Sequence, residues 1–178
     1  MSSSDLTASG PHDADPATAG LPSADLTTGR LVLRPWPRDE IAAVLSGDRR
    51  AHWADDFPAE GDRDIAGFIA EHPSVLDAHG QRQIIERATG LVVGTTGLFW
   101  PPTDGVVEFG YGVVPSRRGR GYATEAARAI VAFALAAPEV DAVLATVEPS
   151  NTASVRVLEK AGLRHAGATE DIATYTTA

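Results

Sequence analysis

Cysteine is absent from this 178-residue sequence, and lysine occurs once, as Lys160. Without cysteine there are no disulfides, no thiolate metal ligands and no cysteine nucleophile. The five histidines show no metal-ligand spacing such as H-E-x-x-H, so no metal is expected. No segment approaches the roughly 18 consecutive apolar residues of a membrane span. The formal net charge of -9 disfavours general attraction to anionic surfaces, so neither nucleic acid nor membrane is expected as a partner.

The first 26 residues are expected to form a disordered tail. Residues 1–25 contain four aspartates, no basic residue and little that could be buried. They lack the basic start and the apolar run of a secretory signal, so a cytoplasmic location is expected. Residues 27–178 then suit one domain with a single core.

Strand-like and helix-like patterns alternate from residue 29 onwards. The predicted strands are 30–36, a hairpin over 82–100 that turns at Thr89-Gly90, 105–115, 142–149 and 172–176, and the predicted helices are 37–47, 64–72, 121–137 and 152–161. A run of strands followed by strand–helix–strand–helix predicts an α/β (α+β) domain, in which helices cover a mixed sheet.

The stretch "PSRRGRGYATEAARAIVAFAL" (115–135) places three arginines and two glycines directly before a helical pattern. A helix N-terminus has free N–H groups and a partial positive charge, which suits a phosphate. Gly119 and Gly121 have no Cβ, so a ligand could approach the backbone closely. No Lys-Ser or Lys-Thr follows, which excludes a Walker A loop. Either the segment is a pyrophosphate site, or the glycines merely close a tight turn, which leaves the clustered arginines unexplained.

Two further segments carry a resemblance to a known family. Residues 118–123 match an Arg/Gln-x-x-Gly-x-Gly/Ala motif, "VEFGYGVVP" (107–115) precedes it as a strand, and Asn151 with "LEKAGL" (158–163) follows. On these residues the chain resembles the GNAT N-acetyltransferase superfamily, over about residues 29–178. It is most similar to the branch that acetylates protein N-termini, including those of ribosomal proteins.

The resemblance implies acetyl-CoA as co-substrate, with no metal, and a mostly antiparallel sheet of about 6–7 strands whose central strands splay apart. The pantetheine arm would lie between those strands, pair with the backbone of Val113 and Val114, and bond to Asn151. Asn151 could instead be a plain helix N-cap. The implied cofactor-binding residues are Val113, Val114, Arg118, Gly119, Arg120, Gly121, Tyr122, Ala123, Thr124 and Asn151.

Amine attack on a thioester requires a group that takes a proton from the amine. Glu108 is the candidate, because on a strand it would share one face with Gly110 and Gly112 and have open space in front of it. It could equally be an exposed carboxylate without a role, and a β-bulge in this strand would reverse the alternation.

The sequence departs from the family pattern at Leu158, where many members place a tyrosine that protonates the leaving thiolate. Leucine cannot donate a proton. Ser154, one turn earlier on the same predicted helix, could protonate the thiolate instead, or water could do so. A third alternative is that no acid is needed, because a thiol with a pKa of about 8.5 leaves readily as a thiolate.

The acceptor is indicated only by residues 54–64, which hold five acids and one arginine. With Trp53, Phe57 and Trp100 as walls, this loop would suit a cationic amine, although it could simply be solvated. The sequence thus favours an N-acetyltransferase that acts on a primary amine, either a small molecule or a protein N-terminus. A catalytically silent acyl-CoA sensor and another kind of nucleotide-phosphate binder remain alternatives, and a homodimer stays open.

Overall fold

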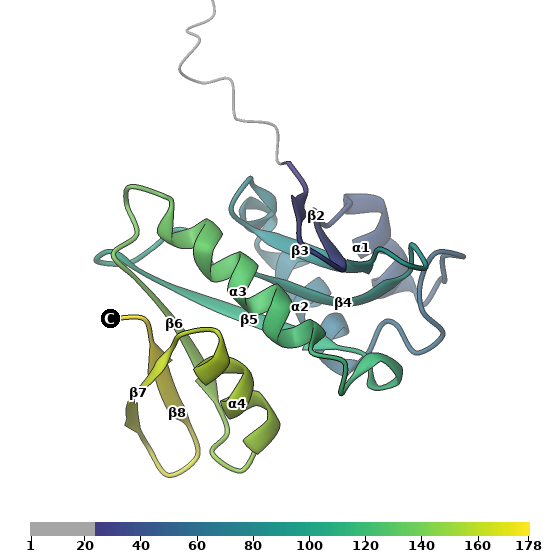
Figure 1. Ribbon diagram of the computed structural model, residues 1–178. Coiled ribbons are helices and arrows are strands. Elements are labelled where there is room, and N and C mark those ends of the chain that lie inside the picture. Colours follow the sequence, from purple (N-terminus) through teal and green to yellow (C-terminus); the bar gives the residue numbers. More distant parts are fainter. Residues whose placement is uncertain (1–23) are drawn as a thin grey trace, which may run out of the picture.

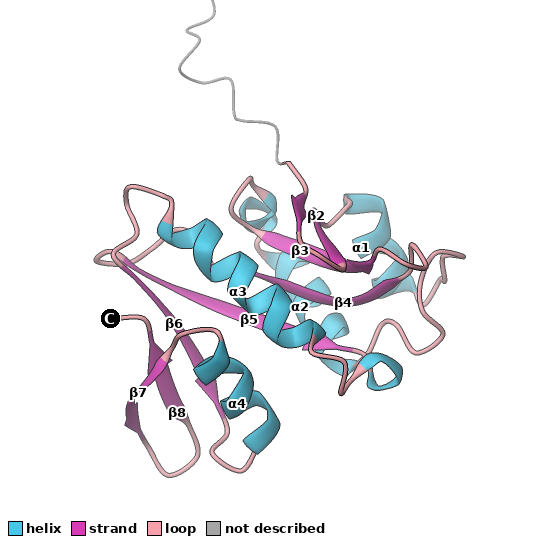
Figure 2. Ribbon diagram, in the orientation of Figure 1, coloured by secondary structure: helices cyan, strands magenta, loops and turns pink. Residues whose placement is uncertain are grey.

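Eight strands form one sheet in the computed structural model, which describes residues 24–178 (Figures 1 and 2). Their order is β1-β2-β3-β4-β5-β6-β8-β7, and every neighbouring pair is antiparallel except β5 and β6. The strands are β1 (Leu26–Thr27), β2 (Leu31–Pro35), β3 (Gln81–Glu86), β4 (Val92–Leu98), β5 (Val106–Val113), β6 (Ala142–Val147), β7 (Arg164–Ala168) and β8 (Ala173–Thr176). The helices are α1 (Arg38–Ser46), α2 (Glu60–Glu71), α3 (Tyr122–Leu135) and α4 (Thr152–Lys160), with short 3₁₀ turns η2 (Pro73–Leu76) and η3 (Pro115–Arg117).

The helices lie on both faces of the sheet. In Figure 1, α3 crosses in front of the sheet, while α1 and α2 lie behind it. The hydroxyl of Thr95 on β4 donates to Asp62 of α2, and Tyr111 on β5 reaches Ser154 of α4 from the other face. The core on the α4 side includes Leu158, which is 1% exposed. Full burial of such a side chain contributes about 1.5–3 kcal/mol.

The predicted elements are present, with two kinds of difference. The sheet has eight strands rather than six or seven, because the two-residue β1 and the short β7 were not predicted. Helix α2 begins at Glu60 rather than 64, since Asp62 reaches back to accept a 2.8 Å hydrogen bond from the N–H of Ala59. The hairpin turn is confirmed: Gly90 has φ 73° and its N–H bonds to the Glu86 carbonyl.

Most of the predicted tail lies outside the described residues. Its last three residues contact the sheet: Asp25 pairs with Arg34, and the carbonyl of Ala24 accepts a hydrogen bond from Arg82. Within residues 24–178, no helix is long and apolar enough to cross a membrane.

Candidate functional site

Strands β5 and β6 part after three paired positions. Val106, Val107 and Glu108 pair with residues 142–144, and the described structure has no further ladder between the two strands. Strand β5 continues to Val113, and Figure 1 shows the two strands diverging from their common end. We call Phe109–Val113 of β5, with 145–147 of β6, the split.

One edge of the β5 backbone faces the split rather than β4. The N–H of Val114 donates to the Val93 carbonyl, and the Glu108 carbonyl accepts from the N–H of Phe99, each at 2.9 Å. Because backbone groups in an antiparallel ladder alternate in direction, those of Tyr111 and Val113 point away from β4 and toward the split. The Val113 carbonyl already accepts a 2.9 Å bond from Arg118 Nε, and the N–H of Val114 is engaged with β4.

Side-chain alternation is preserved along β5. Its register with β4 runs without interruption from Gly94–Val113 to Leu98–Phe109. The register shifts of the described residues lie elsewhere: between β3 and β4, where Ile84 pairs with Gly94 and Ile85 with Val92, and between β7 and β8 near His165. Glu108, Gly110 and Gly112 therefore share one face, as the alternation predicts.

The glycine-rich loop, residues 115–121, leads from β5 into α3. Gly119 and Gly121 have φ 76° and 81°, in the left-handed region that favours glycine. A Cβ at Gly119 would meet nothing within 4 Å. The amide of Arg118 bonds to the Pro115 carbonyl, whereas the first N–H groups of α3, which begins at Tyr122, have no partner within the helix. The loop therefore offers amides and a helix dipole to an anion.

A buried carboxylate lies beneath this loop. Glu86, at the end of β3, has a side chain that is 3% exposed, and its oxygens lie 3.3 Å from Arg117 Nε and 3.7 Å from Arg120 Nη1. Tyr122 donates to it at 2.7 Å and Thr89 also at 2.7 Å. Burial alone would raise the pKa of Glu86, but these hydrogen bonds and the Arg117 charge outweigh it and lower the pKa.

The clustered arginines thus have partners within the protein. Arg117 and Arg120 pair with Glu86, and Arg118 bonds to β5. Arg30, which no sequence motif indicated, donates from Nη1 to the Arg120 carbonyl at 2.7 Å and lies 4.8 Å from the centre of the Tyr122 ring. No local sequence signal links Glu86 or Arg30 to this loop, because the contacts join segments about 30 and 90 residues apart.

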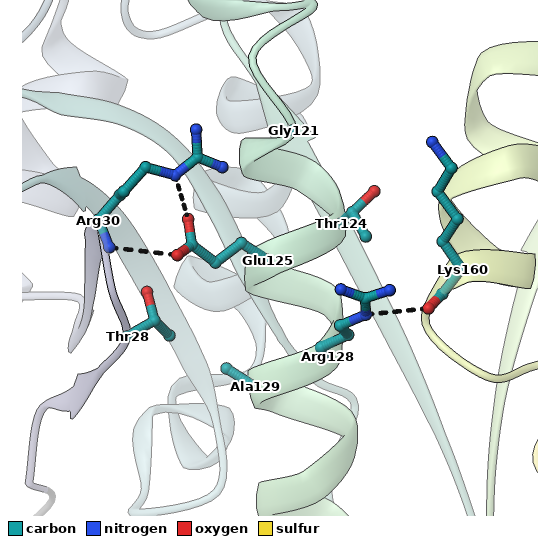
Figure 3. Close-up of a pocket in the computed structure, with 8 residues that line it drawn as sticks. All are labelled: Thr28, Arg30, Gly121, Thr124, Glu125, Arg128, Ala129 and Lys160. Carbon is teal, nitrogen blue, oxygen red and sulfur yellow. Dashed lines mark hydrogen bonds and ion pairs between the residues drawn. The ribbon is translucent and has the colours of Figure 1, made fainter.

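A hollow of about 780 Å³ adjoins the first turn of α3 (Figure 3). On its β2 side, Arg30 Nε pairs with Glu125 at 3.1 Å. On its α4 side, Arg128 Nε donates to the Lys160 carbonyl at 3.0 Å. The cationic side chains of Arg128 and Lys160 both extend near Thr124. The lining residues are Thr28, Arg30, Gly121, Thr124, Glu125, Arg128, Ala129 and Lys160.

Glu108 lies where β5 and β6 stop pairing. Thr146 on β6 donates a 3.0 Å hydrogen bond to its carboxylate. On the same face, a Cβ at Gly110 would come within 3.5 Å of Phe99, and one at Gly112 would meet nothing within 4 Å. Phe99 in turn contacts Phe68 of α2, with ring centroids 5.6 Å apart. The carboxylate therefore borders an open strip of sheet with an aromatic edge.

The opposite face of the split carries hydroxyl groups. Asn151 caps α4: its side chain accepts a 3.1 Å hydrogen bond from the N–H of Ser154, as a plain N-cap does. Ser154 Oγ hydrogen-bonds to the hydroxyl of Tyr111. Leu158 is buried and apolar.

The expected acceptor rim is not formed as predicted. Trp53 and Phe57 are 2% and 0% exposed and belong to the core, where they pack against each other. Asp62 is 4% exposed beneath Thr95, and Asp56 binds Ser116. The apolar periodicity of this region was too weak to separate core aromatics from surface ones. Phe68 and Phe99 border the open strip instead.

The sheet thus splits between two parallel strands, beside a glycine-rich loop that leads into a helix. This arrangement is typical of acetyl-CoA-dependent acetyltransferases. A family model described as the acetyltransferase (GNAT) domain matches residues 30–164. The chain therefore belongs to the GNAT acetyltransferase family. It is 26% identical over 145 residues to the uncharacterized N-acetyltransferase YnaD of Bacillus subtilis, covering 80% of this chain and 84% of that protein.

Solved structures share the fold. A GNAT-family acetyltransferase from Bordetella pertussis superimposes with a TM-score of 0.66 at 24% identity, over 87% of this chain and 99% of the other. A ribosomal L7/L12 α-N-protein acetyltransferase in complex with coenzyme A gives 0.65 at 13% identity, over 86% and 97%.

Proposed function

We propose that the chain transfers the acetyl group of acetyl-CoA to a primary amine by direct attack of the amine on the thioester. The observation that carries this proposal is the split itself, which has backbone groups of β5 on one side and Glu108 at its closed end. An amide-containing arm could bond to the backbone of Tyr111 and to the N–H of Val113, whose carbonyl already accepts from Arg118, much as an added strand would. The open strip beyond Glu108 leaves space from which an amine could approach.

The donor's phosphates fit the glycine-rich loop and the hollow beside it. The loop amides from Gly119 onwards and the α3 dipole would bind the pyrophosphate. Arg128 and Lys160, which lie near Thr124 in Figure 3, would face the nucleotide end. Asn151 is engaged as a helix cap through its Oδ1, which leaves its amide nitrogen for a pantetheine carbonyl.

Glu108 would act as general base. Most of an alkylamine is protonated at neutral pH, so a proton must leave before or during attack. Thr146 fixes the carboxylate through a 3.0 Å bond and leaves its second oxygen for the amine or a bridging water. On the other face of β5, Ser154 would donate a proton to the leaving sulfur, the part that Leu158 cannot play.

The acceptor is a protein N-terminus or a small-molecule amine. Relatives in fold include proteins described as a ribosomal-protein-serine acetyltransferase, a spermidine N-acetyltransferase and an aminoglycoside acetyltransferase. The test is steady-state thiol release from acetyl-CoA with a panel of peptides that have free N-termini, polyamines and aminoglycosides. Turnover with one class supports the proposal and names the acceptor. Tight acetyl-CoA binding without turnover on any amine would favour the alternative, a silent acyl-CoA sensor.

A further inference from the structure

Tyr111 connects β5 to α4 across the split. Its hydroxyl hydrogen-bonds to Ser154 Oγ and also lies 3.2 Å from the Ser154 carbonyl oxygen. Its ring stacks on Phe109, with centroids 5.9 Å apart. The side chain is half-buried, so the hydroxyl group belongs neither to the core nor to open solvent.

Glu108 and Tyr111 lie on opposite faces of the same strand. Alternation places Glu108 on the side of Phe99 and α2, and Tyr111 on the side of α4. At about 3.3 Å per residue, three positions separate them by roughly 10 Å along β5. A proton acceptor and a proton donor thus border the split from its two sides, which suits a reaction in which the amine enters from one face and sulfur leaves at the other.

A serine hydroxyl by itself is a poor source of protons. Ser154 can pass a proton to sulfur efficiently only if another donor restores it at once, and a phenol, with an ordinary pKa of about 10, is far more acidic than an aliphatic alcohol. Tyr111 is placed for this, because its hydroxyl contacts Ser154 Oγ directly. Burial raises the pKa of Tyr111, and the hydrogen bond with Ser154 only partly offsets that effect. The phenol therefore holds its proton throughout the neutral range.

We infer that Tyr111 supplies the proton for the departing thiolate by a relay through Ser154. This inference rests on the proposed acetyl transfer. As the carbon–sulfur bond breaks, its electron pair stays on sulfur. The Ser154 hydroxyl proton moves to sulfur, and the Tyr111 proton moves to Ser154 Oγ. The phenolate that remains takes a proton from water, while the proton lost by the amine resides on Glu108 until it too passes to solvent.

The relay is tested with Tyr111→Phe, Ser154→Ala and the double variant, using acetyl-CoA and the best amine of the panel. Each single variant should lower kcat by roughly 10²-fold, at the lower end for general acid catalysis, while KM for acetyl-CoA changes less than threefold. Because the two groups act in series, the double variant should be no slower than the slower single variant. Multiplied losses would overturn the relay. Tyr175→Phe, on β8 in the same core cluster, is the matched loss of a hydroxyl group and should keep wild-type kcat.

A fluorinated tyrosine at position 111 separates proton donation from a structural role. It keeps the ring and the hydroxyl group but lowers the phenol pKa, so the alkaline fall of kcat should move to lower pH with that pKa. An unmoved profile would overturn the inference, whatever Tyr111→Phe does to folding. If wild-type protein turns over an amine but the Tyr111 variants match it, the inference fails and the proposed function stands. If wild-type protein turns over no amine, both fail.

Discussion

The hydroxyl of Tyr122, in the first turn of α3, donates a 2.7 Å hydrogen bond to the buried carboxylate of Glu86 on β3. The same carboxylate pairs with Arg117, which precedes Gly119, and with Arg120, which lies between Gly119 and Gly121. One side chain of the sheet therefore fixes both ends of the glycine-rich loop. Burial of this carboxylate without its partners would be costly, so carboxylate and loop stabilise each other.

Glu86→Gln should weaken the binding of acetyl-CoA through the loop. The neutral amide cannot accept from all the donors around it, and hydrogen bonds to charged groups are worth about 1.5–3 kcal/mol each. We expect KM for acetyl-CoA to rise about tenfold, equivalent to about 1.4 kcal/mol, with kcat little changed. With acetyl-pantetheine, which lacks the pyrophosphate and the nucleotide, KM should stay within about twofold.

Glu40→Gln is the matched control for Glu86→Gln. Glu40 is also a buried carboxylate with several donors, Trp53 at 2.7 Å and Gln83 at 2.6 Å among them, but it lies on α1, away from the loop. This variant should lower the melting temperature without changing the ratio of KM for acetyl-CoA to KM for acetyl-pantetheine. An equal rise of KM for both donors in Glu86→Gln would show that Glu86 acts on the whole fold rather than on the loop.

Gly121→Val should abolish most of the affinity for acetyl-CoA. Gly121, at the start of α3, has φ 81°, a backbone conformation that strains any β-branched residue. A Cβ added there would lie 3.3 Å from Arg30 Nη2. We expect at least tenfold weaker binding, about 1.4 kcal/mol, by calorimetry. Gly47→Val is the control, because Gly47 ends α1 with φ 82° and imposes the same strain far from the loop. Equal affinity in the two variants would remove the loop from the binding site.

Local patterns were sufficient to predict most of the fold. The α3 stripe, the turn at Gly90 and the glycines before Tyr122 each arise from a periodicity or a backbone requirement that a few neighbouring residues reveal. Strand β7, "RHAGA", lies at the edge of the sheet and buries little of either face, so its sequence shows no apolar alternation. Strand β1 has only two residues. Neither could be predicted from its own composition.

The candidate site was predictable only where it is contiguous in sequence. The glycine-rich loop and Glu108 were recognised from short segments. Glu86, Arg30 and Tyr111 were not, because their importance arises from contacts with segments about 30 to 90 residues away. The same limit explains why the sequence predicted arginines that are available to a ligand, whereas two of them are paired with a carboxylate on β3.

Glu108→Gln tests the general base. The amide keeps the shape and can still accept the Thr146 hydrogen bond, but it cannot take a proton. We expect kcat to fall by roughly 10²–10⁴-fold while the acetyl-CoA affinity barely changes. The ascending limb of the pH–rate profile should move toward the pKa of the amine itself, since only the deprotonated amine then reacts. Glu139→Gln, in the exposed loop before β6, should leave both unchanged. A fall below threefold from pH 6 to 9 would exclude Glu108 as the base.

Lys160→Ala tests whether the hollow beside α3 binds the nucleotide end of acetyl-CoA. If Lys160 and Arg128 face a phosphate there, the variant should bind acetyl-CoA about tenfold more weakly, and lose nothing with the 3′-dephospho form. Arg156→Ala removes a cation from the same helix outside this hollow and should not discriminate between the two donors. Equal weakening of both donors by Lys160→Ala would mean that the lysine acts through general charge alone.

Asp62→Asn should stabilise the protein in a pH-dependent manner. Burial raises the pKa of Asp62, and hydrogen bonds from Thr95 and from the N–H of Ala59 offset this only in part. Because the folded-state pKa is raised, the contribution of this carboxyl to stability is complete below its ordinary pKa and is lost as pH rises through the folded-state value. At pH 7 this raised pKa therefore costs the folded protein stability. Asparagine avoids that cost, since it can accept from Ala59 and donate to Thr95. The variant should unfold at a higher denaturant concentration than wild-type protein at pH 7, and the difference should shrink as the pH falls toward 4.

Asp64→Asn removes the same charge from the exposed face of α2 and should show no such trend. A difference that stays constant with pH would mean that folding does not raise the pKa of Asp62.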